Sequence, residues 1–118
     1  MVIPDEIAEV KSELIRLCDD VAVDLVFTTG GTGLSPRDVT PEATQKVLDR
    51  SLPGISEFLR SHGQERTRYS MLSRGAAGVR KKTVVVNLPG SLAAVNESLD
   101  VLLPWVFHSF PMIKGEPH

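Results

Sequence analysis

Apolar residues recur along this 118-residue chain at two spacings, which predict helices and buried strands. A helix is expected after Pro4, where acidic residues favour the positive end of the helix dipole. Apolar residues then follow at helical spacing: Ile7, Val10, Leu14, Leu17 and Cys18. Two short, mostly apolar runs, residues 23–27 and 83–87, predict strands buried inside a sheet.

Further helical signals lie between and after the two strand-like runs. Thr40 and Pro41 resemble an N-cap and a first helical residue, and Pro53 is expected to end that helix. A short helix is expected over residues 55–59.

A last helical pattern begins near Leu92, and Pro104 is expected to interrupt or restart it. Residues 61–82 are polar and basic, and their pattern indicates no particular element.

The alternation of helices and strand-like runs predicts an α/β fold. We expect an open, mostly parallel sheet with helices on both faces, formed by one domain over residues 1–118. Ligands of such sheets bind beyond the carboxyl ends of the strands. Both strand-like runs end in glycine-containing turns, so a functional site is expected there.

Composition excludes several classes of protein. The formal net charge of −2 argues against nucleic-acid binding, which favours a basic excess. No apolar run approaches the ~18 residues that span a bilayer. Cys18 is the single cysteine, so no intramolecular disulfide can form and a reducing cytoplasm is compatible.

The turn after the first strand-like run is rich in glycine and threonine. Glycines let backbone N–H groups turn toward an anion, and threonine hydroxyls add donors. The residues in question are Thr28, Thr29, Gly30, Gly31, Thr32 and Gly33. Neither a Walker A lysine nor a complete dinucleotide-binding fingerprint follows. A phosphate-binding loop and a connection without a ligand both remain open.

A cation, a carboxylate and a predicted helix start follow this loop. Arg37 can bind phosphate oxygens with two parallel hydrogen bonds. Asp38 can hold Mg²⁺, which prefers one or two carboxylates together with substrate phosphates. A simple turn-forming role for Asp38 is the alternative.

Residues 28–43, with the sequence TTGGTGLSPRDVTPEA, resemble the signature of the Mog/MoaB-type molybdopterin-binding family, which includes the N-terminal domain of gephyrin. Three further segments agree with the family in the same order: residues 3–6, 71–74 and 87–91. The resemblance therefore covers nearly the whole chain.

The resemblance implies a molybdopterin adenylyltransferase, a cytoplasmic enzyme of molybdenum cofactor biosynthesis. Such an enzyme transfers AMP from Mg·ATP to the terminal phosphate of molybdopterin and releases pyrophosphate. Two family aspartates match Asp5 and Asp38, which implies that both serve catalysis and hold the metal. The resemblance further implies a substrate and nucleotide pocket formed by the glycine loop together with Arg37, Ser73, Pro89, Gly90 and Ser91.

Members of this family are often trimers, so a homo-oligomer is expected, with other molybdenum cofactor synthesis proteins as further candidate partners. Family members also begin with an additional strand and helix, which implies that part of the fold is missing from this sequence. An upstream start, supply by another chain and a degenerate remnant remain open. A non-catalytic pterin-binding module or an oligomeric scaffold is the alternative function.

Overall fold

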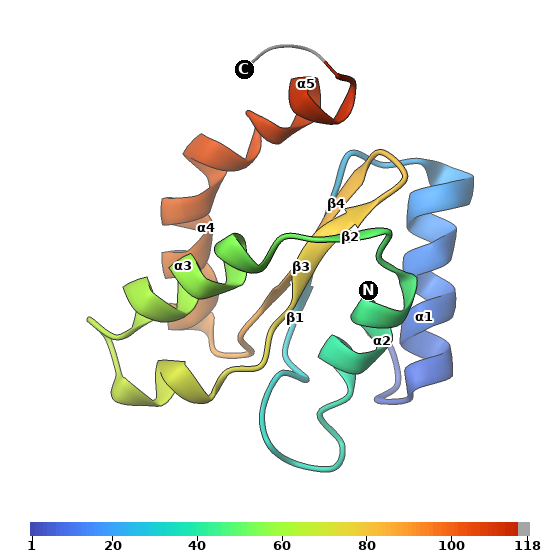
Figure 1. Cartoon of the computed structure of the whole chain (residues 1–118). Coiled ribbons are helices and arrows are strands. Elements are labelled where there is room, and N and C mark those ends of the chain that lie inside the picture. The colour runs from blue at the N-terminus through green and yellow to red at the C-terminus, as the bar shows by residue number, and fades with distance from the viewer. Residues whose placement is uncertain (116–118) are drawn as a thin grey trace.

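The computed structural model describes residues 1–115, which fold around one four-stranded sheet (Figure 1). The strand order is β1-β4-β3-β2, with bounds Leu25–Thr29 (β1), Arg50–Ser51 (β2), Ala77–Arg80 (β3) and Thr83–Leu88 (β4). β1 and β4 pair in parallel, whereas β3 is antiparallel to both β4 and β2. Three strands therefore run in one direction and β3 runs against them, which confirms an open, mostly parallel sheet.

Helices cover both faces of this sheet, as the sequence predicts (Figure 1). The helices on one face are α1 (Ile7–Ile15), its π-helical continuation η1 (Arg16–Val21) and α2 (Thr40–Val47). Those on the other side are α3 (Pro53–Gly63), the 3₁₀ helix η2 (Arg68–Leu72), α4 (Leu92–Val106) and α5 (Ser109–Ile113). None of the helices in residues 1–115 has the length and apolar character that crossing a bilayer requires.

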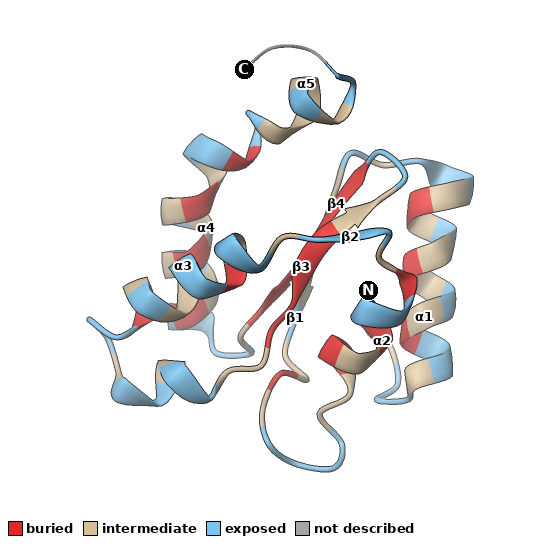
Figure 2. Cartoon of the chain, in the orientation of Figure 1, coloured by how far each residue is buried: buried red, intermediate tan, exposed pale blue. Residues whose placement is uncertain are grey.

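Each face of the sheet has its own apolar core (Figure 2). Side chains of a strand alternate between faces, so Val85 packs against α1 and α2 while Val84 and Val86 pack against α4. All six residues of β4 are buried. Cys18 is also buried in the first core, as its place on the apolar stripe predicts.

The structure corrects the predictions around α2 and α3. Thr40 is the first helical residue and Val39 occupies the cap position. The helix ends at Val47 because the chain then enters the sheet as β2. Pro53 begins α3 instead of ending α2, which is physically reasonable because the first helical turn needs no backbone N–H.

Two later predictions also change. Pro104 lies inside α4, which continues without a break to Val106. Residues 61–82 contain η2 and β3, although their composition indicated neither. Gly78 of β3 packs so closely that an added Cβ would lie 2.3 Å from the carbonyl oxygen of Arg50 on β2.

Asn87, near the carboxyl end of β4, connects this strand to β1, to α2 and to the segment before β3. Its Nδ2 donates hydrogen bonds to the Oγ1 atoms of Thr28 (2.9 Å) and Thr44 (3.0 Å). Its Oδ1 accepts a hydrogen bond from the backbone N–H of Ala76 at 3.0 Å. The Asn87 residue is buried, so these contacts replace water.

Asn87→Ala is therefore expected to lower the free energy of unfolding by about 2–3 kcal/mol, because buried polar groups lose their partners. Asn96→Ala removes the same side chain from an exposed position on α4 and should change it by less than about 0.5 kcal/mol. Urea denaturation of both variants measures the difference. An Asn87→Ala change in the free energy of unfolding as small as that of Asn96→Ala would show that the Asn87 contacts do not stabilise the fold.

Candidate functional site

The glycine-containing turns that follow β1 and β4 lie at the same end of the sheet, because these two strands are parallel neighbours. The backbone N–H of Gly30 donates to the carbonyl oxygen of Leu88 at 3.1 Å. A Cβ added at Gly90 would lie only 3.2 Å from the Cα of Gly30, so the two loops meet backbone to backbone. Gly30 and Gly31 have φ angles of +83° and +69°, in the left-handed region that favours glycine.

An open hollow of about 540 Å³ lies against these loops, and we call it the loop hollow. It brings together seven residues that the sequence assigned to the site: Gly30, Gly31, Thr32, Gly33, Asp38, Ser73 and Gly90. Three exposed side chains that sequence reasoning missed complete its lining: Leu34, Tyr69 and Leu72. Leu34 and Leu72 lie inside the family-like segments 28–43 and 71–74, which could have indicated them, whereas Tyr69 lies outside these segments.

A second hollow of about 450 Å³ adjoins the first between α1, β1 and α2, and we call it the helix hollow. Asp5, Thr28 and Thr29 line it together with Gly30 and Gly31, which also line the loop hollow. Asp5 and Asp38 therefore line two hollows that share part of one wall. Within residues 1–115, no three His, Cys, Asp or Glu side chains gather as a metal site.

Three further predicted residues lie outside both hollows. Pro89 lines a small cavity of about 20 Å³ beside Ser73. The Ser91 hydroxyl caps α4 by accepting a hydrogen bond from the backbone N–H of Ala94 at 3.2 Å. Arg37 is exposed to solvent. Their assignment to a ligand-binding site stays a prediction.

Asp38 forms a turn and also lines the loop hollow. Its Oδ2 accepts a hydrogen bond from the backbone N–H of Ser35 at 2.9 Å, so the turn-forming alternative is present in the structure. The same oxygen would lie 2.8 Å from a Cβ added at Gly33, so the carboxylate packs against the glycine loop. One side chain therefore shapes the loop and offers negative charge to the hollow.

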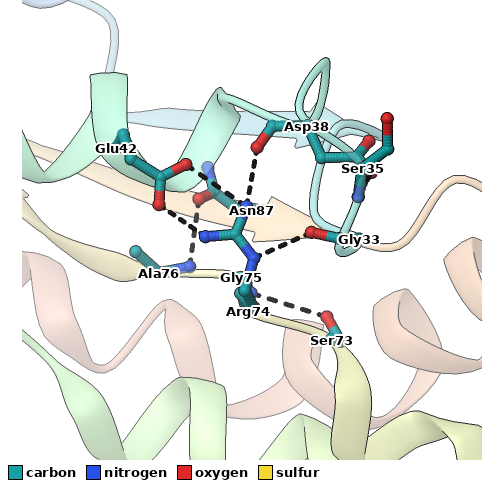
Figure 3. A network of polar contacts seen from close by, with 9 residues as sticks. All are labelled: Gly33, Ser35, Asp38, Glu42, Ser73, Arg74, Gly75, Ala76 and Asn87. Atoms are coloured by element: carbon teal, nitrogen blue, oxygen red, sulfur yellow. Dashed lines mark hydrogen bonds and ion pairs between the residues drawn. The ribbon is translucent and has the colours of Figure 1, made fainter.

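Arg74 connects the segment before β3 to the glycine loop (Figure 3). Its guanidinium donates to the carbonyl oxygens of Gly33 (2.7 Å) and Asp38 (2.6 Å), and to both carboxylate oxygens of Glu42 (2.5 and 3.2 Å). Its backbone N–H donates to the carbonyl oxygen of Thr32 at 2.9 Å. The hydrogen bonds from Arg74 lower the pKa of Glu42 below its usual value, so the ion pair is charged at neutral pH.

The fold and the loops define a class of protein: an α/β domain with a glycine-rich loop at the carboxyl ends of adjacent parallel strands, where ligands of such sheets bind. Residues 1–108 match the family described as "Probable molybdopterin binding domain". The chain belongs to this family.

Named relatives agree with this membership. The chain is 40% identical over 114 residues to a molybdopterin adenylyltransferase of Helicobacter pylori, covering 97% of this chain and 65% of the relative. It is 44% identical over 115 residues to a molybdenum cofactor biosynthesis bifunctional protein of Chlorobaculum tepidum, covering 98% of this chain and 36% of the relative. The chain thus spans about one third to two thirds of the length of these curated relatives.

A solved structure shows the same fold. The molybdopterin biosynthesis enzyme MoaB of Thermus thermophilus superposes with a TM-score of 0.87 at 46% sequence identity. The match covers 97% of this chain and 72% of that chain.

Proposed function

We propose that this domain catalyses Mg-dependent adenylyl transfer from ATP to molybdopterin in molybdenum cofactor biosynthesis. A phosphate oxygen of the pterin attacks the α-phosphorus of ATP, the new phosphoanhydride bond forms, and the bond to pyrophosphate breaks. No protein nucleophile takes part, so the protein has to position two anions and offset their charge.

The convergence of the glycine loop, Asp38, Ser73 and Gly90 on one hollow carries this proposal. Two strands end there, and the left-handed glycines leave the loop backbone free of side chains that would obstruct an anion. A hollow of about 540 Å³ lies within the range of volumes typical of small-molecule sites. The adjoining helix hollow offers space for part of a second substrate.

The carboxylates present suit Mg²⁺ only in combination with a substrate. Asp5 lines the helix hollow and Asp38 lines the adjoining loop hollow, and Mg²⁺ usually takes one or two carboxylates plus phosphate oxygens and water. Both would hold the ion, which would offset the negative charge of the phosphates. Because Asp38 Oδ2 accepts the hydrogen bond from Ser35, Oδ1 is the carboxylate oxygen that is left to bind the ion.

The direct experiment incubates the purified chain with molybdopterin and Mg·ATP and measures pyrophosphate and adenylylated pterin. Both products are expected in equal amounts, and omission of Mg²⁺ should abolish them. The proposal fails if the chain is folded, binds molybdopterin and forms neither product over many hours.

A second candidate is a module that binds molybdopterin without turnover. The placement of Asp5 and Asp38 in separate hollows favours it, because one ion would have to lie between them. Binding of molybdopterin, measured by fluorescence, without pyrophosphate release would support this candidate. Turnover by the chain alone would exclude it.

The proposal also includes a trimer and a cytoplasmic location, which follow from the family resemblance. Light scattering on the purified chain tests the trimer: the expected mass is three times 12.9 kDa. A monomer at all concentrations would remove this part of the proposal.

A further inference from the structure

We propose that Arg74 is a positioning residue that holds the glycine loop and Asp38 in their ligand-binding arrangement without contacting the substrates. This inference rests on the proposed adenylyl transfer for its kinetic test. Its structural part can be tested without any substrate.

The contacts of Arg74 converge on the segment that forms the loop hollow (Figure 3). Side chain and backbone together contact the carbonyl oxygens of Thr32, Gly33 and Asp38. The two ends of the bend from Gly33 to Asp38 are thereby held by the same guanidinium. Glu42 of α2 accepts two more hydrogen bonds and fixes the guanidinium relative to the helix.

The number of N–H donors that Arg74 has left distinguishes a positioning role from direct substrate binding. A guanidinium carries five N–H donors, and four hydrogen bonds to protein oxygens are already present. Arg74 lines a separate hollow with Ser73 and Gly75 but not the loop hollow, whereas Gly33 and Asp38, which it holds, both line the loop hollow. The positive charge is also paired with the Glu42 carboxylate. Arg74 therefore acts on ligands through the loop.

A lysine cannot replace this arrangement. Its ammonium is a compact charge on a flexible stem, and it lacks the rigid planar fork that reaches carboxylate and carbonyl oxygens simultaneously. If Arg74 only supplied charge to a substrate phosphate, Arg74→Lys would keep most of the activity. If it positions the loop, Arg74→Lys and Arg74→Gln should fail to a similar degree.

Arg80 offers a matched control elsewhere in the fold. Its guanidinium donates to both carboxylate oxygens of Asp19 (3.0 and 2.8 Å) and to the carbonyl oxygen of Val47 (2.9 Å). It therefore has the same kind of fork, but it lines neither hollow. Removing either guanidinium should lower the free energy of unfolding, but only removal of the Arg74 guanidinium should affect the loop hollow.

The experiment compares Arg74→Lys and Arg74→Gln with Arg80→Lys and Arg80→Gln in the full chain. We expect kcat/KM for adenylyl transfer to fall about 10²-fold in both Arg74 variants, as for displaced reacting groups. The Arg80 variants should stay within about twofold of the wild type. An Arg74→Lys variant with near-wild-type kcat/KM, or equal losses in the Arg80 variants, would overturn the proposal.

Amide hydrogen exchange of the ligand-free proteins provides the second measurement. Faster exchange confined to residues 30–38 is expected in the Arg74 variants and not in the Arg80 variants. Unchanged exchange there would overturn the positioning role whether or not the wild type turns over. If the wild type makes no product, the proposed function fails, and the exchange result alone then decides the role of Arg74.

Discussion

Asp38→Asn is expected to lower the kcat of adenylyl transfer by about 10²–10³-fold, the range found when one group that stabilises transition-state charge is removed. The substitution keeps the shape of the side chain. The asparagine oxygen can still accept the hydrogen bond that Asp38 Oδ2 receives from Ser35, so the turn is preserved. What is lost is the negative charge beside the glycine loop. Pyrophosphate release at saturating Mg·ATP measures the effect.

Two further aspartate variants make this result specific. Asp5→Asn should lower kcat by a similar factor, because both carboxylates are proposed to bind the same Mg²⁺ ion. Asp100→Asn changes an exposed carboxylate on α4 and should leave kcat unchanged. Full activity of a variant that carries both Asp5→Asn and Asp38→Asn would refute the proposed chemistry.

Gly31→Ala is expected to lower the free energy of unfolding by more than about 2 kcal/mol. A left-handed backbone alone costs a residue other than glycine roughly 1–2 kcal/mol. The new Cβ would also lie 2.2 Å from Thr40 Oγ1 and 3.1 Å from Thr40 Cβ, so the loop or the start of α2 has to move. The hydrogen bond from the Thr40 N–H to the Gly31 carbonyl oxygen (3.2 Å) would be disturbed as well.

Gly54→Ala provides a control with the opposite expected sign. Gly54 lies in the first turn of α3, and a Cβ there would meet no atom within 4 Å. Helix propensity then favours alanine by up to about 1 kcal/mol. Urea denaturation compares the two variants. A Gly31→Ala protein as stable as the wild type would contradict the close packing of the glycine loop on α2.

The two strands with a mostly apolar run were predictable from the sequence. The runs around Val26 and Val85 form β1 and β4; the prediction of a buried strand is confirmed for β4, whereas β1 lies at the edge of the sheet and only its Val26 is buried. β2 was missed because its residues Arg50 and Ser51 are exposed and have no apolar pattern. β3 was missed because it contains Gly78, which has low strand propensity and is needed there for close packing against β2. Their pairing depends on contacts between distant segments, which local patterns do not encode.

In the candidate site, too, residues with a local sequence signal could be predicted and contacts between distant segments could not. The sequence assigned residues 30–33 and Asp38 to one site because their types suit phosphate and metal chemistry, and they line the loop hollow together; their binding roles stay predictions. The contacts of Arg74 were not predictable, because it reaches Gly33 from 41 positions later in the chain. Ser91 shows that a predicted ligand-binding side chain can also have a purely local partner, in this case a helix N-terminus.

The bare backbone contact between Gly30 and Gly90 restricts how this domain can diversify. A Cβ at Gly90 would lie 3.2 Å from the Gly30 Cα, which is tighter than an ordinary contact, whereas at Gly30 the left-handed φ of +83° is what disfavours any other residue. The exposed side chains of Leu34, Tyr69 and Leu72 line the same hollow, so they are the positions where its shape can vary with least disturbance of the packed strand ends.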